Sequence, residues 1–411
     1  MIELIQYSPT TPDVHAEPVL IVPAWIMKYY ILDLSPKNSL VAWLVDQGYT
    51  VFMMSWKNPT AADRELGMDD YLRKGVYAAL DVVGAVVPDR DIHAVGYCIG
   101  GTLLSIAAAA LADWGDTRIR DVTLFAAQTD FSEPGELSLY ISPAQLEMLE
   151  ALMYKEGVLD SKQMGGAFAM LRAHDLLWQP AVKSYLKGER DGMIDLMAWN
   201  ADGTRMPWKM HTEYLMGLYL RNDLAEGRFK VEGEPVSLKD IRVPMFVVGT
   251  ETDHVAPWKS VYKVGGLTSS SEFTFLLTSG GHNAGIVSGP VHPKRRHRVR
   301  TQREGESAAA GGRVVRDDGN EAGFLVADLG RVSSRPIPRR SASRRRQSAR
   351  RKRVTSRLPT RRASTVQAAL THNHEDCRLR ALECAGRPHG FRIPLKAANL
   401  VSASTALSFR R

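Results

Sequence analysis

Apolar residues in the first part of the chain fall into short runs that alternate with stretches of helical spacing. Runs that are apolar throughout indicate strands buried on both faces, and a period of 3.6 residues indicates helices. The expected strands are residues 18–23, 49–54, 91–95, 121–126, 243–248 and 272–277, and the expected helices among them are residues 40–45, 68–87 and 102–107. This alternation predicts an α/β fold, with a mainly parallel sheet and helices on both faces.

The alternation stops between about residues 131 and 238. This stretch is rich in Met, Leu, Tyr and Trp, and its spacing is mostly helical. Because expected strands lie on both sides of it, we expect a helical cap inserted between two strands of the sheet.

Charge divides the chain near residue 290. Residues 1–290 carry 24 Lys and Arg against 36 Asp and Glu, whereas residues 291–411 carry 29 against 9. Residues 335–362 are a low-complexity run dominated by Arg and Ser, which cannot bury enough apolar surface to fold. We therefore divide the chain into an α/β domain, residues 1–292, and a basic tail, residues 293–411, which we expect to be disordered or translated in a shifted reading frame.

The tail suggests two kinds of ligand, and we expect neither. Its 26 Arg and 3 Lys favour contacts with phosphates, but aromatic residues for base stacking are nearly absent and no nucleic-acid-binding module is recognisable. His372, His374, Cys377 and Cys384 match a metal-binding set in residue type only, because no strand or helix pattern surrounds them. We therefore predict no metal site and no nucleic-acid binding.

Cysteine usage and the N-terminus indicate a cytoplasmic protein. The first domain contains one cysteine, Cys98, which cannot form a disulfide framework and so favours a reducing compartment. The N-terminal residues lack the basic start and apolar core of a signal peptide. The longest apolar stretch, residues 103–112, is about half of a membrane span and predicts a buried helix instead.

Residues 96–100 form a G-x-C-x-G box with a cysteine at its centre, Cys98. An expected strand precedes the box and an expected helix follows it, which is the context of the nucleophile elbow in α/β-hydrolase folds. Glycines flank the nucleophile because the turn is tight and strained. A cysteine in this position predicts acyl transfer through a thioester.

Two polar loops after the last expected strands supply an acid and a base. Asp253 follows strand 243–248, and His282 follows strand 272–277. Both lie at the carboxyl ends of strands, where ligands gather in open α/β sheets, and they keep the chain order nucleophile, acid, histidine. We expect Asp253 to orient His282, and His282 to deprotonate Cys98, because a free thiol with a pKa of about 8.5 is mostly protonated at neutral pH.

Other residues remain alternatives for these roles. His254 is next to Asp253 and is either an alternative base or a supporting residue, and Asp130 follows another expected strand and is an alternative acid. His93 lies inside an expected strand and His211 lies in the cap, and we expect structural roles for both.

The oxyanion hole is expected beside the nucleophile. The backbone N–H of Ile99 follows the nucleophile and would be one donor. A second donor would come from the loop after the first expected strand, near Trp25 or Ile26.

Taken together, six stretches resemble the catalytic domain of class I polyhydroxyalkanoate (polyhydroxybutyrate) synthases. They are PAWIMKYYILDL at 23–34, SWKNP at 55–59, GMDDY at 67–71, GYCIGG at 96–101, TDHVAPW at 252–258 and SGGHNAGIV at 279–287. They span nearly all of residues 1 to 290, and the set is far more specific than a single G-x-C-x-G box.

The resemblance implies roles, substrates and partners. The family's catalytic cysteine, aspartate and late histidine fall on Cys98, Asp253 and His282, and His254 is part of the family motif. The implied reaction polymerises (R)-3-hydroxyacyl-CoA, with 3-hydroxybutyryl-CoA as the expected monomer, and releases coenzyme A, which is part of substrate and product and not a resident cofactor. The resemblance also implies a homodimer at the surface of polyester granules in the cytoplasm.

Three departures from the family pattern qualify the resemblance. Family members carry a large N-terminal region before the position where this chain starts, have PPWIN where this chain has PAWIM, and carry a Trp-rich segment after the position of Pro290. They predict a chain that starts at an internal Met and ends in foreign sequence. The alternatives are a cysteine-nucleophile hydrolase or thioesterase, and an inactive remnant whose basic tail binds nucleic acid.

Overall fold

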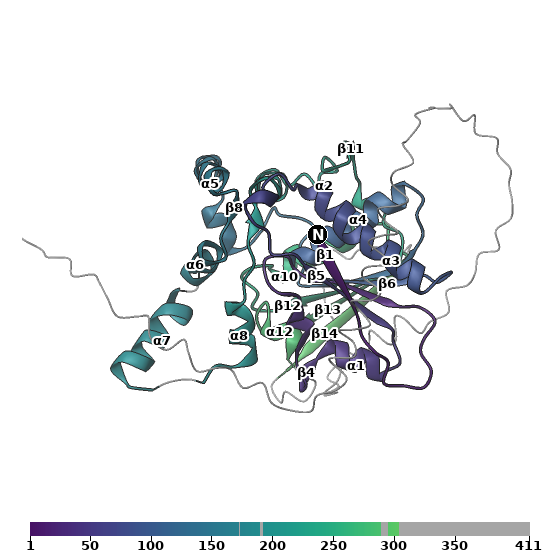
Figure 1. Ribbon diagram of the computed structural model, residues 1–411, viewed down its shortest axis with the longest axis horizontal. Helices are drawn as coiled ribbons and strands as arrows, with labels where there is room; N and C mark the ends of the chain where they lie inside the picture. The colour runs from purple at the N-terminus through teal and green to yellow at the C-terminus, as the bar shows by residue number, and fades with distance from the viewer. Residues whose placement is uncertain (172, 190–191, 289–294, 304–411) are drawn as a thin grey trace, which may run out of the picture. The chain divides into compact units, whose positions relative to one another are not determined.

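The computed structural model describes residues 1–171, 173–189, 192–288 and 295–303 of the chain. Within these residues, eight strands form one sheet in the order β1-β5-β2-β6-β7-β12-β13-β14 (Figure 1). The strands from β5 to β13 run parallel, whereas the edge strands β1 and β14 are antiparallel to their neighbours. Their bounds are β1 Ile2–Gln6, β2 Val19–Val22, β5 Val51–Trp56, β6 Ile92–Tyr97, β7 Ile119–Phe125, β12 Met245–Thr250, β13 Glu272–Thr278 and β14 His297–Arg303.

Helices cover both faces of this sheet (Figure 1). The helices α3 and α4 pack on one face, and α1 packs on the other. Their bounds, with those of the other helices outside the cap, are α1 Leu40–Asp46, α2 Met68–Tyr71, α3 Ala78–Val86, α4 Ile99–Asp113, α10 Trp258–Tyr262, α11 Val264–Leu267 and α12 Ala284–Val287. Short 3₁₀ helices are Tyr29–Leu32, Ala61–Asp63, Glu136–Tyr140 and Leu238–Asp240, and a small hairpin pairs β3 Asp33–Ser35 with β4 Asn38–Ser39.

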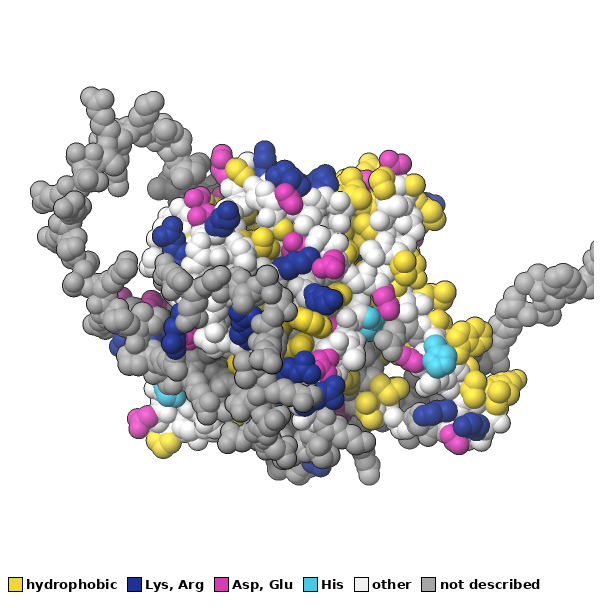
Figure 2. All heavy atoms as spheres, turned by 180° about the vertical axis from the view of Figure 1, so that it is seen from behind, with side chains coloured by type: hydrophobic (Ala, Val, Ile, Leu, Met, Phe, Trp, Pro, Cys, Tyr) yellow, Lys and Arg dark blue, Asp and Glu magenta, His cyan; other side chains and the backbone are white. Residues whose placement is uncertain are grey.

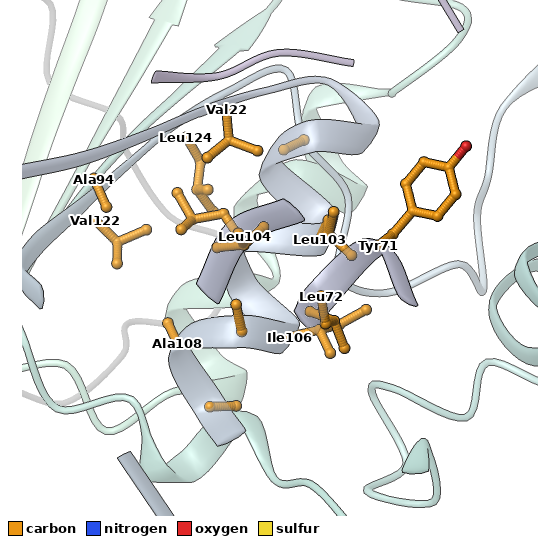
Figure 3. Packing of buried hydrophobic residues seen from close by; sticks show 14 of the residues in the cluster. Val22, Tyr71, Leu72, Ala94, Leu103, Leu104, Ile106, Ala108, Val122 and Leu124 are labelled. Atoms are coloured by element: carbon orange, nitrogen blue, oxygen red, sulfur yellow. The ribbon is translucent and has the colours of Figure 1, made fainter. Parts of the chain in front are cut away.

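Alternate residues of each inner strand enter two separate hydrophobic cores. In β2, Leu20 and Val22 belong to the core under α4, whereas Val19 and Ile21 belong to the core under α1. Successive side chains of a strand point to opposite faces, so a strand covered on both sides must be apolar throughout. Figure 3 shows strand side chains such as Leu124 lying against Leu104 of α4.

Helix α4 accounts for the longest apolar stretch of the sequence. Its residues Gly100–Leu111 are buried, which confirms the prediction of a buried helix there. Among the helices in the described part of the chain, none has the length and apolarity that a bilayer crossing requires.

The expected helix at residues 68–87 is one continuous helical run with a change of pitch. It comprises α2, a π-helical segment Leu72–Tyr77 and α3, and Val86 is its last residue before Pro88. At its start, Asp70 accepts a hydrogen bond from the backbone N–H of Gly67 at 3.1 Å, which satisfies one donor that the helix leaves open.

The stretch between β7 and β12 carries the cap helices. They are α5 Pro143–Glu156, α6 Ser161–Leu171, α7 Gln179–Ala181, α8 Asp195–Ala201 and α9 Trp208–Tyr214, with π-helical segments His174–Trp178, Val182–Leu186 and Leu215–Leu220. Two short ladders pair β8 Val158–Leu159 with β9 Met206–Pro207, and β10 Lys230–Val231 with β11 Glu234–Pro235. Most of the exposed large apolar side chains of the described residues lie in this stretch, between residues 139 and 197, and apolar side chains gather on that side of the molecule in Figure 2. A sheet with these crossovers and this insertion is an α/β-hydrolase fold with a helical cap, which is the predicted fold class.

Two edge strands differ from the expected elements. Strand β1 has no counterpart among them, and β14 lies beyond the domain boundary that we place at residue 292. All seven residues of β14 pair with β13, from Thr278 opposite His297 to Glu272 opposite Arg303. An antiparallel edge strand is joined through its backbone and needs no apolar alternation, which is why hydrophobic spacing does not identify it. The low-complexity run at residues 335–362 and the His and Cys set at residues 372–384 lie outside the described residues.

Candidate active site

Cys98 lies in the turn between β6 and α4. Its backbone has φ 53° and ψ −130°, a strained conformation for a residue with a side chain. The backbone N–H of Cys98 donates to the carbonyl of Phe125 on β7 at 2.9 Å, which fastens the turn to the sheet. The residue is 9% exposed, so the thiol is buried but lies at the edge of the core.

The flanking glycines are required by crowding around this turn. A Cβ on Gly96 would lie 2.4 Å from Cα of Gly101, and a Cβ on Gly100 would lie 2.4 Å from the carbonyl oxygen of Val22. Both obstacles are backbone atoms that cannot swing aside. The glycines of the G-x-C-x-G box therefore let the strand, the helix and the loop after β2 approach one another.

Cys98, His282 and Asp253 form a continuous hydrogen-bonded series. His282 Nε2 lies 3.2 Å from the Sγ atom of Cys98, and His282 Nδ1 lies 2.8 Å from Asp253 Oδ2. Cys98 lies in the turn after β6, Asp253 in the loop after β12 and His282 in the loop after β13. These three connections meet at one edge of the sheet because the strands run parallel. The structure thus brings together the three residues that the sequence singles out for catalysis.

Asp253 is held as a carboxylate by several donors. Its Oδ1 accepts hydrogen bonds from the backbone N–H groups of Val255 at 2.9 Å and Ala256 at 2.8 Å, and its Oδ2 accepts one from Thr250 Oγ1 at 3.0 Å. Burial alone would raise the pKa of Asp253, but the charge of His282 and these donors outweigh burial and hold the pKa below its usual value.

His282 is correspondingly a strong base. Burial by itself would lower the pKa of its imidazole. The negative charges of Asp253 and of a Cys98 thiolate, with the hydrogen bonds to both residues, outweigh burial and raise the pKa well above its usual value. The imidazole is therefore well suited to accept the proton of the Cys98 thiol, which lies 3.2 Å from Nε2.

The residues expected in the oxyanion hole lie on two adjoining backbone segments. Ile99 is the first residue of α4, where backbone N–H groups have no acceptor within the helix. The carbonyl of Pro23 lies 2.5 Å from the ideal Cβ position of Gly100, so the loop carrying Trp25 and Ile26 passes directly beside the elbow. The hydroxyl of Thr204 in the cap donates to the carbonyl of Trp25.

The alternative residues are engaged elsewhere. Asp130 accepts hydrogen bonds from Ser132 and lies 3.5 Å from Lys263 Nζ. His93 pairs with Asp121 toward the opposite end of the sheet, with Nδ1 2.6 Å from Oδ2. The buried ring of His211 stacks on Tyr214 with a centroid distance of 6.2 Å, and burial lowers its pKa to about 4.

His254 contacts the start of the cap through its backbone. Its carbonyl accepts a hydrogen bond from the N–H of Glu136 at 3.0 Å. The imidazole that reaches Cys98 is that of His282. His254 is thus placed to support the connection between the acid loop and the cap.

Sequence reasoning missed a second link between the nucleophile turn and the base loop. Tyr97, immediately before Cys98, donates its hydroxyl hydrogen to Oδ1 of Asn283, immediately after His282, at 2.5 Å. The rings of Tyr97 and His282 have centroids 5.9 Å apart. Both residues stand next to catalytic candidates in the sequence, but only the fold shows that they meet.

The cap contributes two tyrosines that sequence reasoning also missed. Tyr214 and Tyr219 have ring centroids 5.5 Å apart, and Tyr214 packs edge-on against Trp25. Burial is the main cause that raises the pKa of each phenol, and the charge of Cys98 raises both further. Both phenols therefore stay protonated in the buried cluster beside Trp25.

Metal chemistry has no candidate site within the described residues. No group of three or more His, Cys, Asp and Glu side chains is arranged there to hold a metal ion.

Comparison with known proteins connects this geometry to one family. A family described as the N-terminus of poly-beta-hydroxybutyrate polymerase (PhaC) matches residues 1–44. A poly(3-hydroxyalkanoate) polymerase of Methylorubrum extorquens is 41% identical over 301 residues, which are 73% of this chain and 49% of that protein. A poly(3-hydroxyalkanoate) polymerase subunit PhaC of Rhizobium meliloti (strain 1021) is 38% identical over 340 residues, 83% of this chain and 56% of that protein. The chain spans about half the length of the curated relatives it matches.

Solved structures with a similar course of the chain include a hydrolase from Oleispira antarctica. The identity is 16%, the TM-score is 0.42, and the match covers 70% of this chain and 89% of that protein.

Proposed function

Because this chain belongs to the family of the poly(3-hydroxyalkanoate) polymerases, we propose that it is an acyltransferase that polymerises (R)-3-hydroxyacyl-CoA into polyhydroxyalkanoate. The expected monomer is 3-hydroxybutyryl-CoA. The observation that carries the proposal is the series Cys98–His282–Asp253, with 3.2 Å between Nε2 and Sγ and 2.8 Å between Nδ1 and Oδ2. Coenzyme A is part of substrate and product, and the proposal requires no resident cofactor or metal.

In the loading step, Cys98 attacks the thioester carbonyl of the substrate. His282 takes the thiol proton, and the imidazolium is stabilised by Asp253. The backbone N–H of Ile99, with a donor from the loop of Trp25 and Ile26, receives the negative charge on the carbonyl oxygen. Collapse of the intermediate breaks the bond to the CoA sulfur, and His282 returns the proton to that sulfur, so that CoA leaves and the acyl group remains on Sγ.

In the elongation step, the hydroxyl of another hydroxyacyl group or chain end attacks the Cys98 thioester. His282 or Asp253 accepts the hydroxyl proton, an ester bond forms, and the thiol of Cys98 is restored. Exchange of one thioester for another is nearly isoenergetic, so loading is reversible and the acyl group stays activated. Conversion of a thioester into an oxoester lowers the free energy, so the elongation step drives the overall reaction.

The cap supports polymerisation over hydrolysis. Tyr214 and Trp25 belong to the same buried cluster, 6% and 2% exposed, so that apolar rings rather than solvent adjoin the oxyanion loop. Exclusion of water suppresses hydrolysis of the acyl-enzyme. A thioesterase would use the same Cys98 chemistry with water as the acceptor, and product analysis separates the two activities.

We extend the proposal to assembly and location. The family resemblance implies a homodimer at the surface of polyester granules in the cytoplasm. The exposed apolar side chains of the cap, which include Trp178, Tyr185 and Leu186, support an apolar contact of this kind, because large exposed apolar patches mark interaction surfaces.

The test uses the purified chain with 3-hydroxybutyryl-CoA. We expect release of CoA together with polymer, detected by mass spectrometry of the products. Cys98→Ala should abolish CoA release, with an unchanged circular dichroism spectrum as the folding control. Free hydroxy acid without polymer would identify a thioesterase, and CoA release by the Cys98→Ala variant would refute the assignment of the nucleophile.

A further inference from the structure

The loop that carries His282 connects the end of β13 to the short helix α12. Its position decides whether Nε2 of His282 meets Sγ of Cys98. Asp253 and the Tyr97 hydroxyl hold the loop on the side of the nucleophile, at His282 and Asn283. A third group holds the loop at residues on both sides of His282.

That group is the guanidinium of Arg295. Its Nη1 donates to the carbonyl oxygen of Ser279 at 2.5 Å, and its Nη2 donates to the carbonyl oxygen of Ala284 at 2.6 Å and to the hydroxyl of Ser288. Ser279 precedes His282 and Ala284 follows it, so one planar group ties together the two arms of the loop. Such a forked donor suits this task better than a single ammonium group.

The loop is shaped to admit the guanidinium. Gly280 has φ +113°, a conformation that residues with a side chain rarely adopt, and a Cβ there would lie 2.1 Å from Nη1 of Arg295. The backbone angle therefore requires glycine, and a side chain there would displace the end of the Arg295 side chain. Arg295 is half-buried, and this burial lowers the pKa of its guanidinium.

The sheet in turn holds Arg295 in place. The next residue, Arg296, accepts a backbone hydrogen bond from Ser279 at 2.9 Å, and its side chain pairs with Glu251 at 2.6 Å. Strand β14 begins one residue later and pairs with β13 along its whole length. The backbone next to Arg295 is thus held at the edge of the sheet, and the side chain of Arg295 extends from there to the loop of His282.

We infer that Arg295 is a positioning residue, which holds the loop so that His282 reaches Cys98. The inference rests on the proposed function for its turnover measurement only. It also assigns a role to a residue that follows the domain boundary expected from sequence. A purely structural Arg295 would affect folding stability and leave the pairing of Cys98 with His282 intact.

The first measurement is the pH dependence of Cys98 alkylation by iodoacetamide. In the wild type His282 contacts Sγ and activates Cys98, and in Arg295→Met, where this contact is lost, alkylation near pH 6 should be about tenfold slower. Alkylation is followed on the peptide that contains Cys98, because the chain also contains Cys377 and Cys384. Arg303→Met is the matched control, because Arg303 lies on β14 with its side chain 59% exposed and pairs with Glu272.

The second measurement is turnover of 3-hydroxybutyryl-CoA. Arg295→Met should lower kcat by about a hundredfold with little change in KM, since a misplaced catalytic group costs rate rather than substrate binding. Arg295→Lys keeps the positive charge but not the planar group with several donors, and its kcat should lie between the values of Arg295→Met and wild type. Millimolar guanidinium should partly restore the kcat of Arg295→Ala.

The outcomes separate this inference from the proposed function. A wild-type alkylation profile and kcat in a folded Arg295→Met, with only a lower melting temperature, would overturn the positioning role. A shifted alkylation profile supports that role even where the wild type forms no polymer, and in that case the proposed function alone fails. Should Arg295→Met not fold, the same comparison is made with Arg295→Lys.

Discussion

Two buried histidine–aspartate pairs lie toward opposite ends of the same sheet. At the carboxyl end, His282 Nδ1 is 2.8 Å from Asp253, and toward the amino end of β6, His93 Nδ1 is 2.6 Å from Asp121. Each pair also has a tyrosine ring beside its imidazole, Tyr97 at 5.9 Å and Tyr49 at 6.2 Å between centroids. Residue types, distances and burial are therefore nearly the same in the two places.

The difference lies in what carries the histidine. His93 is inside β6, where neighbouring strands and Asp121 enclose it, so its imidazole serves packing and a local hydrogen bond. His282 is on a loop beyond β13, and its Nε2 meets the Sγ atom of Cys98 at 3.2 Å. A buried His–Asp pair becomes a catalytic relay only where a loop brings the second ring nitrogen to a nucleophile. The comparison also explains why a histidine within a strand is a poor candidate for the base.

Replacing each histidine by glutamine tests the comparison most strongly. His282→Gln should lower kcat for CoA release by about 10²- to 10⁴-fold, because general base catalysis is lost. His93→Gln should leave kcat unchanged and lower the free energy of unfolding by about 1 to 3 kcal/mol, because a buried hydrogen bond is disturbed. Enzyme kinetics and denaturant titration of both variants provide the measurements. Equal losses of kcat in the two variants would remove the distinction between the two ends of the sheet.

The free energy of unfolding should depend on pH through the shifted pKa values of His282 and Asp253. Despite burial, the charges of Asp253 and Cys98 raise the pKa of His282, so its contribution to stability is fully present below about pH 6.5 and is lost as pH rises through the raised value. Despite burial, His282 and the surrounding donors lower the pKa of Asp253, so its contribution is present above about pH 3.9 and is lost as pH falls through the lowered value.

The difference in melting temperature between wild type and His282→Gln should therefore be largest between about pH 4 and pH 6.5. It should shrink at higher pH. Thermal unfolding across this range measures it, and a difference that grows as the solution becomes alkaline would contradict the assigned direction of the His282 shift.

The smallest expected effect concerns the tyrosines beside the two pairs. Tyr97→Phe removes the hydrogen bond to Asn283 and should lower kcat by about fivefold, the equivalent of one hydrogen bond. Tyr49→Phe, at the other pair, should leave kcat unchanged. Steady-state kinetics of both variants measure these effects. An unchanged kcat in Tyr97→Phe would show that Asp253 and Arg295 hold the loop of His282 without the tyrosine.

Much of the fold is legible in the sequence because buried parallel strands must be apolar on both faces. The inner strands, from β5 to β13, all lie within a few residues of the apolar runs that predict them. The edge strands β1 and β14 are not predicted by such runs, because backbone pairing on one side places little demand on side chains. For the same reason, the sequence pattern ends the α/β domain at residue 292, before β14. This strand is rich in Arg and joins the sheet through its main chain.

By itself, the sequence determined the nucleophile turn and the order of its partners. The G-x-C-x-G box between a strand and a helix, and polar loops after later strands, follow from local chemistry and from the rule that parallel strands end at one edge. The tertiary structure alone decided that Tyr97 reaches Asn283 and that Arg295 enters the loop of His282. These are contacts between residues up to 186 positions apart, such as Tyr97 with Asn283, and they depend on distances of a few ångströms that no local pattern encodes.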